Sequence, residues 1–314
     1  MNISVAEPGQ VSSRVIILLD LDCFYAQCES VRLSLSPSIP LCLLQWNSAL
    51  AVNYPARERF GLKRGDTFEE IQEKSNGQCV ALHLPVLSTA DIQEKDGDEE
   101  DASIKITYER EFNRPTDQKR EIFLKEKNKM RHSGEGKASL DRYRLASARI
   151  FQVMLEALET HVGKNNFILE KASIDELYLD ITEHCFKEDD DSCAWEVDGA
   201  DSPELKETTL NETYVCAKEK IRMPDTHDAD QRALWRGCVI ARGLRQAVFE
   251  CLGFTLSAGI STSKLVAKLG GSLGKPDGQA VVFPEAIPHV SLIACLLFRR
   301  IDCKRIVHNV LLRY

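Results

Sequence analysis

The sequence predicts an α+β fold built on a mixed or antiparallel sheet with flanking helices. Residues 14–22, RVIILLDLD, form a continuous apolar run rich in β-branched residues, which is typical of a buried central strand. Residues 167–182, FILEKASIDELYLDIT, alternate apolar and polar side chains around an Asp-Glu pair, which indicates an antiparallel hairpin. Residues 139–162 carry apolar side chains at helical spacing. Strands that alternate with helices and include a hairpin favour the α+β class.

The elements expected before residue 88 follow from apolar spacing and from turn residues. A helix is expected over residues 23–35, with Phe24, Cys28, Val31 and Leu35 on one face, until the prolines that follow stop it. The other expected elements are strands at 40–44, 48–53 and 78–87, a short helix at 54–60 that ends at Gly61, and a helix that begins near Thr67 with Glu70 as its capping-box partner.

The elements expected after residue 136 begin with the 139–162 helix, which Ser139 caps and whose apolar side chains are Tyr143, Ala146, Ile150, Val153, Leu155 and Leu158. The hairpin that follows has Leu177, Leu179 and Ile181 on one face. The remaining elements are a helix at 234–252 closed by Gly253, a strand at 254–261, a helix at 262–274, and a turn and strand at 275–283.

Charge is distributed unevenly along the 314 residues. The net charge is −8, but residues 89–101 and 183–211 carry −6 and −8, so the other residues sum to +6. A nucleic-acid partner is therefore not excluded. Residues 1–13 are expected to be a flexible lead-in, and 88–136 a charged, partly disordered insertion. Within that insertion, Lys119 to Arg131 is either a nucleic-acid-binding or localisation segment or, as we favour, an exposed charged helix.

Several classes of protein are disfavoured. The apolar run at 290–298 is far shorter than the roughly 18 residues of a membrane span, so no membrane partner is expected. The eleven cysteines are scattered without a CxxC pair, which favours reduced thiols over a disulfide framework. Neither GxxxxGK[ST] nor GxGxxG occurs, which disfavours a P-loop enzyme and a Rossmann oxidoreductase.

Three carboxylates carry the candidate chemistry. Asp20 stands at the end of the first strand, and Asp175 and Glu176 stand at the apex of the hairpin. If these strands are neighbours, the three side chains converge and repel one another unless divalent cations such as Mg²⁺ neutralise them. Two such ions could activate an attacking oxygen and stabilise a leaving one in phosphoryl transfer. Turn or strand-end carboxylates without a ligand are an equally open interpretation. Basic groups that could reach a triphosphate are Arg57, Lys63, Arg64 and Lys275.

Five blocks, taken together, resemble a known family. They are LLDLDCFYAQCE, AVNYPARERFGLKRGDTFEE, SLDRYRLAS, KASIDELYLDIT and SAGISTSKLVAKLGGSLGKPDGQAVV. In this order they resemble the Y-family translesion DNA polymerases, and within them the eta branch. The resemblance implies a palm-type sheet from residues 14–22 and 137–283, a small fingers domain at 23–87, and an incomplete thumb-like tail at 284–314.

The resemblance also implies roles for individual residues. Asp20, Asp175, Glu176 and the carbonyl of Leu21 would bind two Mg²⁺ ions, for which Mn²⁺ could substitute. Tyr25 matches the steric gate against ribonucleotides. The residues that match triphosphate ligands are Tyr54, Arg57 and Lys275, while Arg64 matches a fingers arginine that reaches the nascent base. Lys264 and Lys268 match lysines of their block, but a solvated helix face accounts for both equally well.

The implied activity is template-directed DNA synthesis past damaged bases, by transfer of a nucleotide from dNTP to a primer 3′-hydroxyl. The expected partners are primer–template DNA, dNTP, and a replication clamp or other repair proteins, and the expected location is the nucleus. Two alternatives stay open. One is a truncated, non-catalytic polymerase relic that binds DNA or a partner. The other is a palm-type nucleotidyl cyclase, which would not require the YPAR and GKPDGQ sequences.

Overall fold

The computed structural model of the chain describes residues 14–87, 107–132, 135–186, 213–216 and 228–287. The chain divides into two units: residues 1–20, 156–246 and 256–314 form the first, and residues 21–155 and 247–255 form the second. The predictions made for residues 1–13 and for most of 183–211 and 284–314 lie outside the described residues. No helix in the described ranges is long and apolar enough to cross a bilayer.

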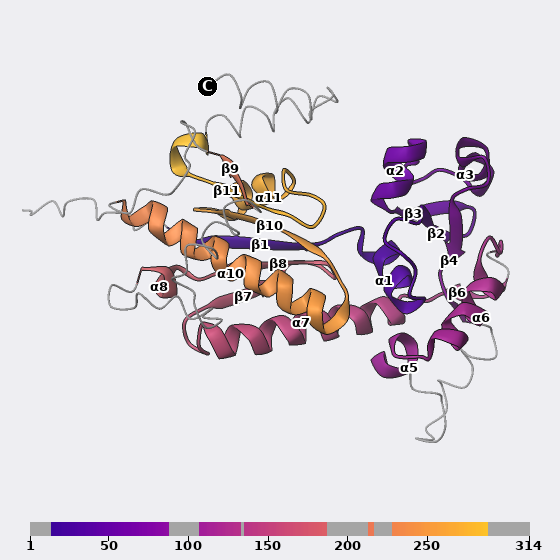
Figure 1. Cartoon of the computed structure of the whole chain (residues 1–314), viewed down its shortest axis with the longest axis horizontal. Coiled ribbons are helices and arrows are strands. Elements are labelled where there is room, and N and C mark those ends of the chain that lie inside the picture. Colours follow the sequence, from indigo (N-terminus) through magenta and orange to yellow (C-terminus); the bar gives the residue numbers. More distant parts are fainter. Residues whose placement is uncertain (1–13, 88–106, 133–134, 187–212, 217–227, 288–314) are drawn as a thin grey trace, which may run out of the picture. The chain divides into compact units, whose positions relative to one another are not determined.

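The first unit contains a mixed sheet, which has six strands in the part of the chain that the structure describes (Figure 1). Their order is β7 (Ile168–Lys171), β8 (Glu176–Asp180), β1 (Ile16–Leu21), β10 (Leu256–Ser261), β11 (Gln279–Val282) and β9 (Thr213–Cys216). β8 pairs antiparallel with both β7 and β1, whereas β11 pairs parallel with both β10 and β9. The predicted mixed sheet, the central strand and the hairpin are confirmed.

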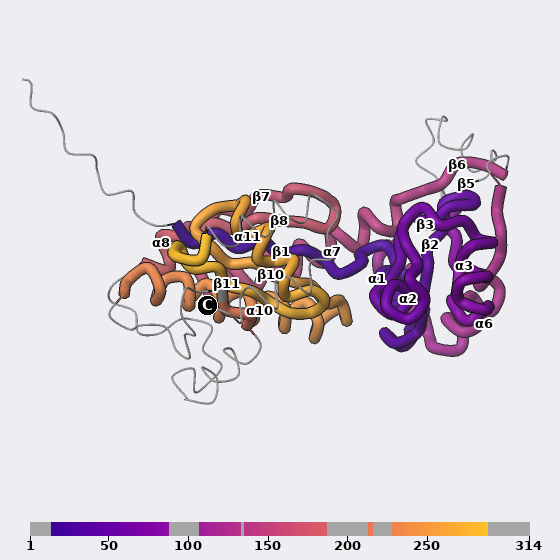
Figure 2. The backbone as a smooth tube through the Cα atoms, turned by 90° about the horizontal axis from the view of Figure 1, so that it is seen from above, coloured from indigo at the N-terminus to yellow at the C-terminus, as the bar shows by residue number. Residues whose placement is uncertain are grey.

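Both faces of β1 are covered, which explains its continuous apolar sequence. On one face, Ile16 and Leu18 pack with Ala267 of α11 (Lys264–Gly271). On the other face, α10 (Ala229–Leu252) approaches so closely at Gly237 that a Cβ there would lie 2.9 Å from Val15 Cγ1. Figure 2 shows α11 and α10 on opposite sides of β1. Since Asp20 has the same strand parity as Ile16 and Leu18, it belongs to the α11 face.

A glycine in β10 sets the distance between the sheet and α11. A Cβ at Gly259 would lie 1.9 Å from the backbone oxygen of Ala267. No side chain fits such a gap, so strand and helix meet backbone to backbone. Ser263 caps the helix, because its side chain accepts a hydrogen bond from the Val266 N–H at 3.4 Å. These local features fix where α11 presents its lysines.

The second unit contains a three-stranded sheet, ordered β3 (Ser48–Val52), β2 (Leu41–Gln45) and β4 (Val80–His83) within the described ranges. Figure 2 shows β2 beside β3, with which it pairs antiparallel. A buried cluster joins the sheet to α2 (Tyr54–Phe60) and α3 (Phe68–Ser75); it consists of Cys42, Leu44, Ala49, Val52, Ala56, Leu62, Ile71, Cys79 and Ala81. A separate ribbon pairs β5 (Val86–Leu87) with β6 (Lys137–Ala138).

The predicted end of α2 and the predicted beginning of α3 are confirmed. α2 ends at Gly61, whose φ of 65° is left-handed. α3 begins with the predicted capping box, in which the Thr67 side chain accepts from the Glu70 N–H and the Glu70 carboxylate accepts from the Thr67 N–H. The other described elements are α1 (Phe24–Arg32), α5 (Tyr108–Phe112), α6 (Thr116–Glu126), α7 (Asp141–His161), α8 (Thr182–Cys185) and a short 3₁₀ turn at Pro284–Ala286.

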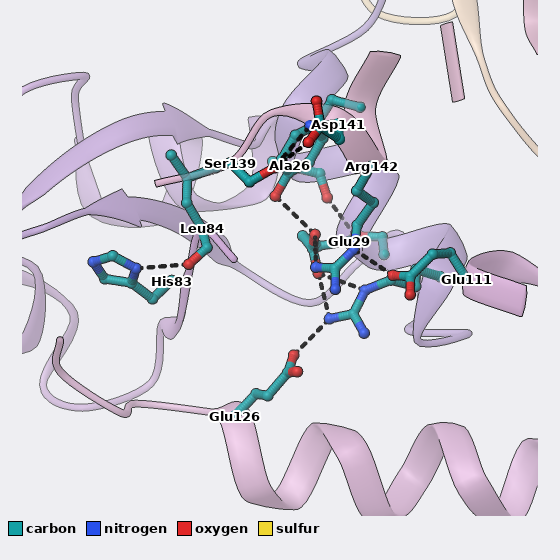
Figure 3. Close-up of polar contacts among 12 residues, drawn as sticks. Ala26, Glu29, His83, Leu84, Glu111, Glu126, Ser139, Asp141 and Arg142 are labelled. Atoms are coloured by element: carbon teal, nitrogen blue, oxygen red, sulfur yellow. Dashed lines mark hydrogen bonds and ion pairs between the residues drawn. The ribbon is translucent and has the colours of Figure 1, made fainter. Parts of the chain in front are cut away.

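Buried charges hold α1, α5, α6 and α7 together (Figure 3). Glu29 of α1 is fully buried and accepts from Arg32 at 2.6 Å, from Arg142 at 3.1 Å and from the Tyr143 hydroxyl at 2.8 Å. Arg32 also donates to Glu126 at 2.6 Å, and Arg142 donates to Glu111 at 2.6 Å. This network was not predicted. The surrounding cations lower the pKa of Glu29 to about 2, against the effect of its burial.

Some expected boundaries were wrong. α1 ends at Arg32, before the prolines, because Ser34 takes a left-handed φ of 51°. The strand expected at 78–87 is two strands, β4 and β5, interrupted around Pro85. Leu155 is 41% exposed, because it lies off the buried stripe of α7.

The charged insertion contains helices in its described part. α6 has no buried residue, which confirms the exposed charged helix over most of Lys119 to Arg131. α5, in contrast, buries Tyr108 and Phe112, whose rings stack at 4.6 Å. The strand β9, which directly follows the acidic insertion and pairs with β11, was also not predicted from the sequence.

Candidate functional site

Two of the three predicted carboxylates lie opposite each other in the sheet of the first unit. The antiparallel register of β1 and β8 pairs Asp20 with Glu176. Asp175 precedes Glu176 in the hairpin turn, where Ser173 organises the backbone. The Ser173 hydroxyl donates to Asp175 Oδ1 at 2.5 Å and accepts from the Asp175 and Glu176 N–H groups at 3.2 and 3.0 Å. The turn therefore fixes the hairpin end that carries both acids.

Two lysines balance this negative charge. Lys275 Nζ lies 2.6 Å from Asp20 Oδ2, and Lys268 Nζ lies 3.0 Å from each carboxylate oxygen of Glu176. Lys268 is presented by α11. Lys275 stands in the loop before β11, which closes so tightly that a Cβ at Gly278 would lie 2.2 Å from the Gly274 carbonyl oxygen. Asp20 and Glu176 thus each have an ammonium partner.

The electrostatics differ between the two ion pairs. Burial raises the pKa of Asp20 to about 6, and the like charges of Glu176 and Asp175 act in the same direction, while Lys275 opposes them. The hydrogen bond to Glu176 is the main cause that raises the pKa of Lys268 above its ordinary value. Asp20 is therefore a partly desolvated carboxylate, and Lys275 offsets only part of the effect of its burial.

This donor set fits a hard divalent cation. Carboxylate oxygens are the ligands that Mg²⁺ prefers, and the β1–β8 register places Asp20 opposite Glu176. Within the described ranges, no three His, Cys, Asp or Glu side chains are already gathered as metal ligands. The lysines occupy carboxylate oxygens that a cation would need, so Lys275 and Lys268 are direct competitors for the same ligands.

The other predicted site residues belong to the second unit. The Tyr25 ring lies edge-on to Tyr143, with centroids 5.0 Å apart and planes at 71°. Arg57 places its guanidinium 5.3 Å from the Tyr54 ring centroid and donates to the Val52 carbonyl at 2.8 Å. The Arg64 side chain is exposed. Phe24, for which helix packing was an open interpretation, is 2% exposed. Leu21, whose carbonyl was the further predicted ligand, is the last residue of β1.

Sequence reasoning undervalued the lysines of α11. Lys264 forms an ion pair with Glu170 and lies 5.4 Å from the Tyr178 ring centroid, while Lys268 holds Glu176. Both residues are exposed, as a solvated helix face predicts, and each also pairs with a glutamate of the β7–β8 hairpin. Their spacing of four residues, which places both on one helix face, was the available signal.

A match to a family profile shows to which protein family the chain belongs. The impB/mucB/samB family profile, which describes a Y-family domain, matches residues 19–272, most of the chain. The chain belongs to this family. The matched range includes Asp20, Asp175 and Glu176, as well as every predicted substrate ligand except Lys275. The resemblance seen in the sequence blocks is confirmed.

Curated members of the Y family align with most of the chain. DNA polymerase eta of Saccharomyces cerevisiae is 27% identical over 310 residues, which cover 89% of the chain and 43% of that protein. DNA polymerase eta of Arabidopsis thaliana is 28% identical over 88% of the chain and 34% of that protein. DNA polymerase iota of Homo sapiens is 26% identical over 89% of the chain and 28% of that protein. The chain thus spans less than half the length of these Y-family relatives.

Proposed function

We propose that this chain carries the nucleotidyl-transfer site of a Y-family DNA polymerase and supports template-directed DNA synthesis past damaged bases. The observation that carries the proposal is the pairing of Asp20 with Glu176 across β1 and β8, next to Asp175. Membership of the family and similarity to proteins named DNA polymerase eta and iota support the same activity.

In this proposal Asp20, Asp175, Glu176 and the Leu21 carbonyl hold two divalent cations, Mg²⁺ or Mn²⁺. Bound Mg²⁺ would supply the Lewis acidity that activates a primer 3′-hydroxyl and neutralises triphosphate charge. Lys275, which pairs with Asp20, would donate to a triphosphate oxygen if that carboxylate served a cation. Lys268, which pairs with Glu176, would be available to substrate on the same condition. The lysines keep the carboxylates compensated until substrate arrives.

The resemblance assigns the other proposed substrate contacts to residues that lie in the second unit. Tyr25, braced edge-on by Tyr143, would exclude a ribose 2′-hydroxyl by steric contact. The Arg57 guanidinium, placed next to the Tyr54 ring, would hold the triphosphate together with that tyrosine. Arg64 is free to extend toward the nascent base because its side chain is exposed. The proposed partners are primer–template DNA, dNTP and a replication clamp or other repair proteins, and the proposed location is the nucleus.

Primer extension tests the proposal. The full chain is given a labelled primer on undamaged and thymine-dimer templates with Mg²⁺, next to the double variant Asp175→Asn/Glu176→Gln and the control Glu121→Gln. Glu121 is an exposed carboxylate of α6 that pairs with Lys125. We expect incorporation by the wild type and the control, and loss in the double variant.

Other results would contradict the proposal. Undiminished incorporation by the folded double variant would show that these carboxylates do not carry the reaction. DNA binding without incorporation at any enzyme concentration would favour the non-catalytic relic. Formation of a cyclic nucleotide without template would identify the chain as a nucleotidyl cyclase.

A further inference from the structure

The second unit contains a pocket of about 360 Å³ that the proposed polymerase chemistry does not use. The charged insertion builds one side of it through α5 and α6, and the ends of α1 and α10 and the middle of α7 supply the rest. None of the carboxylates or predicted substrate ligands lines it. Its lining includes Ser34, Tyr108, Phe112, Lys119, Arg149 and Cys251, and we call this cavity the Lys119 pocket.

Two cations in the Lys119 pocket lack a carboxylate partner among the described residues. Lys119 Nζ donates to the Ser34 hydroxyl at 3.1 Å and forms no ion pair within those residues. Burial and the nearby charge of Arg32 lower the pKa of Lys119 below its ordinary value. Arg149 is half-buried and also forms no ion pair in the described part of the chain. One acid, Glu109, lines the pocket and is exposed to solvent.

The absence of a carboxylate partner for Lys119 and Arg149 within the described ranges contrasts with the buried arginines of the same unit. Arg32 and Arg142, which are more deeply buried, are each matched by two glutamates in the network of Figure 3. A partly desolvated cation without a counter-ion is unfavourable, and an anion that enters the cavity relieves that cost. Tyr108 and Phe112, which also line the pocket, are buried and stack with their ring planes 9° apart.

We propose that the Lys119 pocket binds a phosphate-type oxyanion between Lys119 and Arg149. The guanidinium fork of arginine matches the oxygens of phosphate, and an ammonium adds a point charge. The phosphate belongs either to a small molecule such as pyrophosphate or to a nucleic-acid backbone, since both present the same oxygens. The site is independent of the proposed polymerase function, because it shares no residue with the carboxylates.

Cys251 provides a reporter inside the pocket, because it lines the cavity and is an exposed free thiol. The full chain is alkylated with iodoacetamide, and modification of the Cys251 peptide is followed by mass spectrometry with inorganic pyrophosphate, with a short single-stranded oligonucleotide, or with neither. Thermal unfolding is recorded with the same probes. At a probe concentration ten times its Kd, alkylation should slow by roughly tenfold if the bound anion shields the thiol.

Four single variants test whether the protection depends on the two cations of the pocket. Lys119→Gln and Arg149→Gln should each weaken protection by roughly tenfold, since each removes one charged hydrogen-bond donor. Lys119→Arg should retain it. Lys125→Gln removes a lysine from the exposed side of the same helix, outside the pocket, and should behave as wild type.

The two probes separate the two sources. Protection by pyrophosphate places a small molecule in the pocket, and protection by the oligonucleotide alone places a nucleic-acid phosphate there. The proposal would be overturned if neither probe slowed the alkylation of Cys251 or shifted the thermal unfolding of the chain. Equal protection in wild type, Lys119→Gln and Arg149→Gln would overturn it as well.

Discussion

Replacing Glu29 with glutamine should destabilise the fold, and the loss should depend on pH. Glu29 is fully buried and accepts hydrogen bonds from Arg32, Arg142 and Tyr143. Glu29→Gln keeps the shape of the side chain but removes its charge, so both guanidiniums lose one of their two acidic partners. Removal of one member of a buried ion network is usually strongly destabilising.

The size of the effect follows from the pKa. The pKa of Glu29 falls from 4.5 to about 2 in the folded chain, which corresponds to roughly 3 kcal/mol of stability at neutral pH. Because the folded-state pKa is the lower one, this contribution is fully present above pH 4.5 and is lost as the pH falls toward 2. At about pH 3.5 roughly 1 kcal/mol of it should be gone.

Urea unfolding followed by circular dichroism measures both quantities. Wild type, Glu29→Gln and the control Glu121→Gln are compared at neutral pH and at about pH 3.5. The control removes an exposed carboxylate that pairs with Lys125, so it should change stability by less than about 0.5 kcal/mol. The reasoning would be refuted if the free energy of unfolding of Glu29→Gln lay within about 0.5 kcal/mol of that of the wild type at neutral pH. It would also be refuted if the difference between the two chains did not shrink at about pH 3.5.

Three further variants test other parts of the structure. Gly259→Ala should cost about 3 kcal/mol or prevent folding, because its Cβ would lie 1.9 Å from the Ala267 oxygen; a melting temperature equal to wild type would contradict this packing. Thr67→Ala should cost about 1 kcal/mol in chemical denaturation, since it removes the α3 cap, and no change would argue against that cap. Asp20→Asn should raise stability in Mg²⁺-free buffer at neutral pH by about 1 kcal/mol or more, because burial disfavours the charged carboxylate. That gain should shrink as the pH falls below about 6 and vanish below about pH 3, where Asp20 is protonated in both states; a loss of stability at neutral pH would contradict it.

Features that depend on a few neighbouring residues could be predicted from the sequence. The apolar run of β1, the alternation of the β7–β8 hairpin and the Thr67–Glu70 capping box each lie within a short segment. The expected convergence at the sheet edge also followed, because the apex of a hairpin next to β1 must place Glu176 near Asp20.

Contacts between distant segments could not be predicted in this way. Glu29 and Arg142 are 113 positions apart, and nothing in either segment shows that one buried charge compensates the other. The partners of Lys268 and Lys275 depend on where α11 and the loop before β11 meet the sheet, which the close approach at Gly259 determines. β9 is short and follows a charged stretch, so only its pairing with β11 reveals it.

The central claim is that the carboxylates of β1 and β8 bind divalent cations. Electron paramagnetic resonance of Mn²⁺ tests it most directly, with the full chain titrated in the presence of a non-hydrolysable dNTP analogue. We predict Mn²⁺ binding by wild type and Glu121→Gln, and loss of that binding in Asp20→Asn/Glu176→Gln with the fold retained. Equal Mn²⁺ binding by all three chains would contradict the claim.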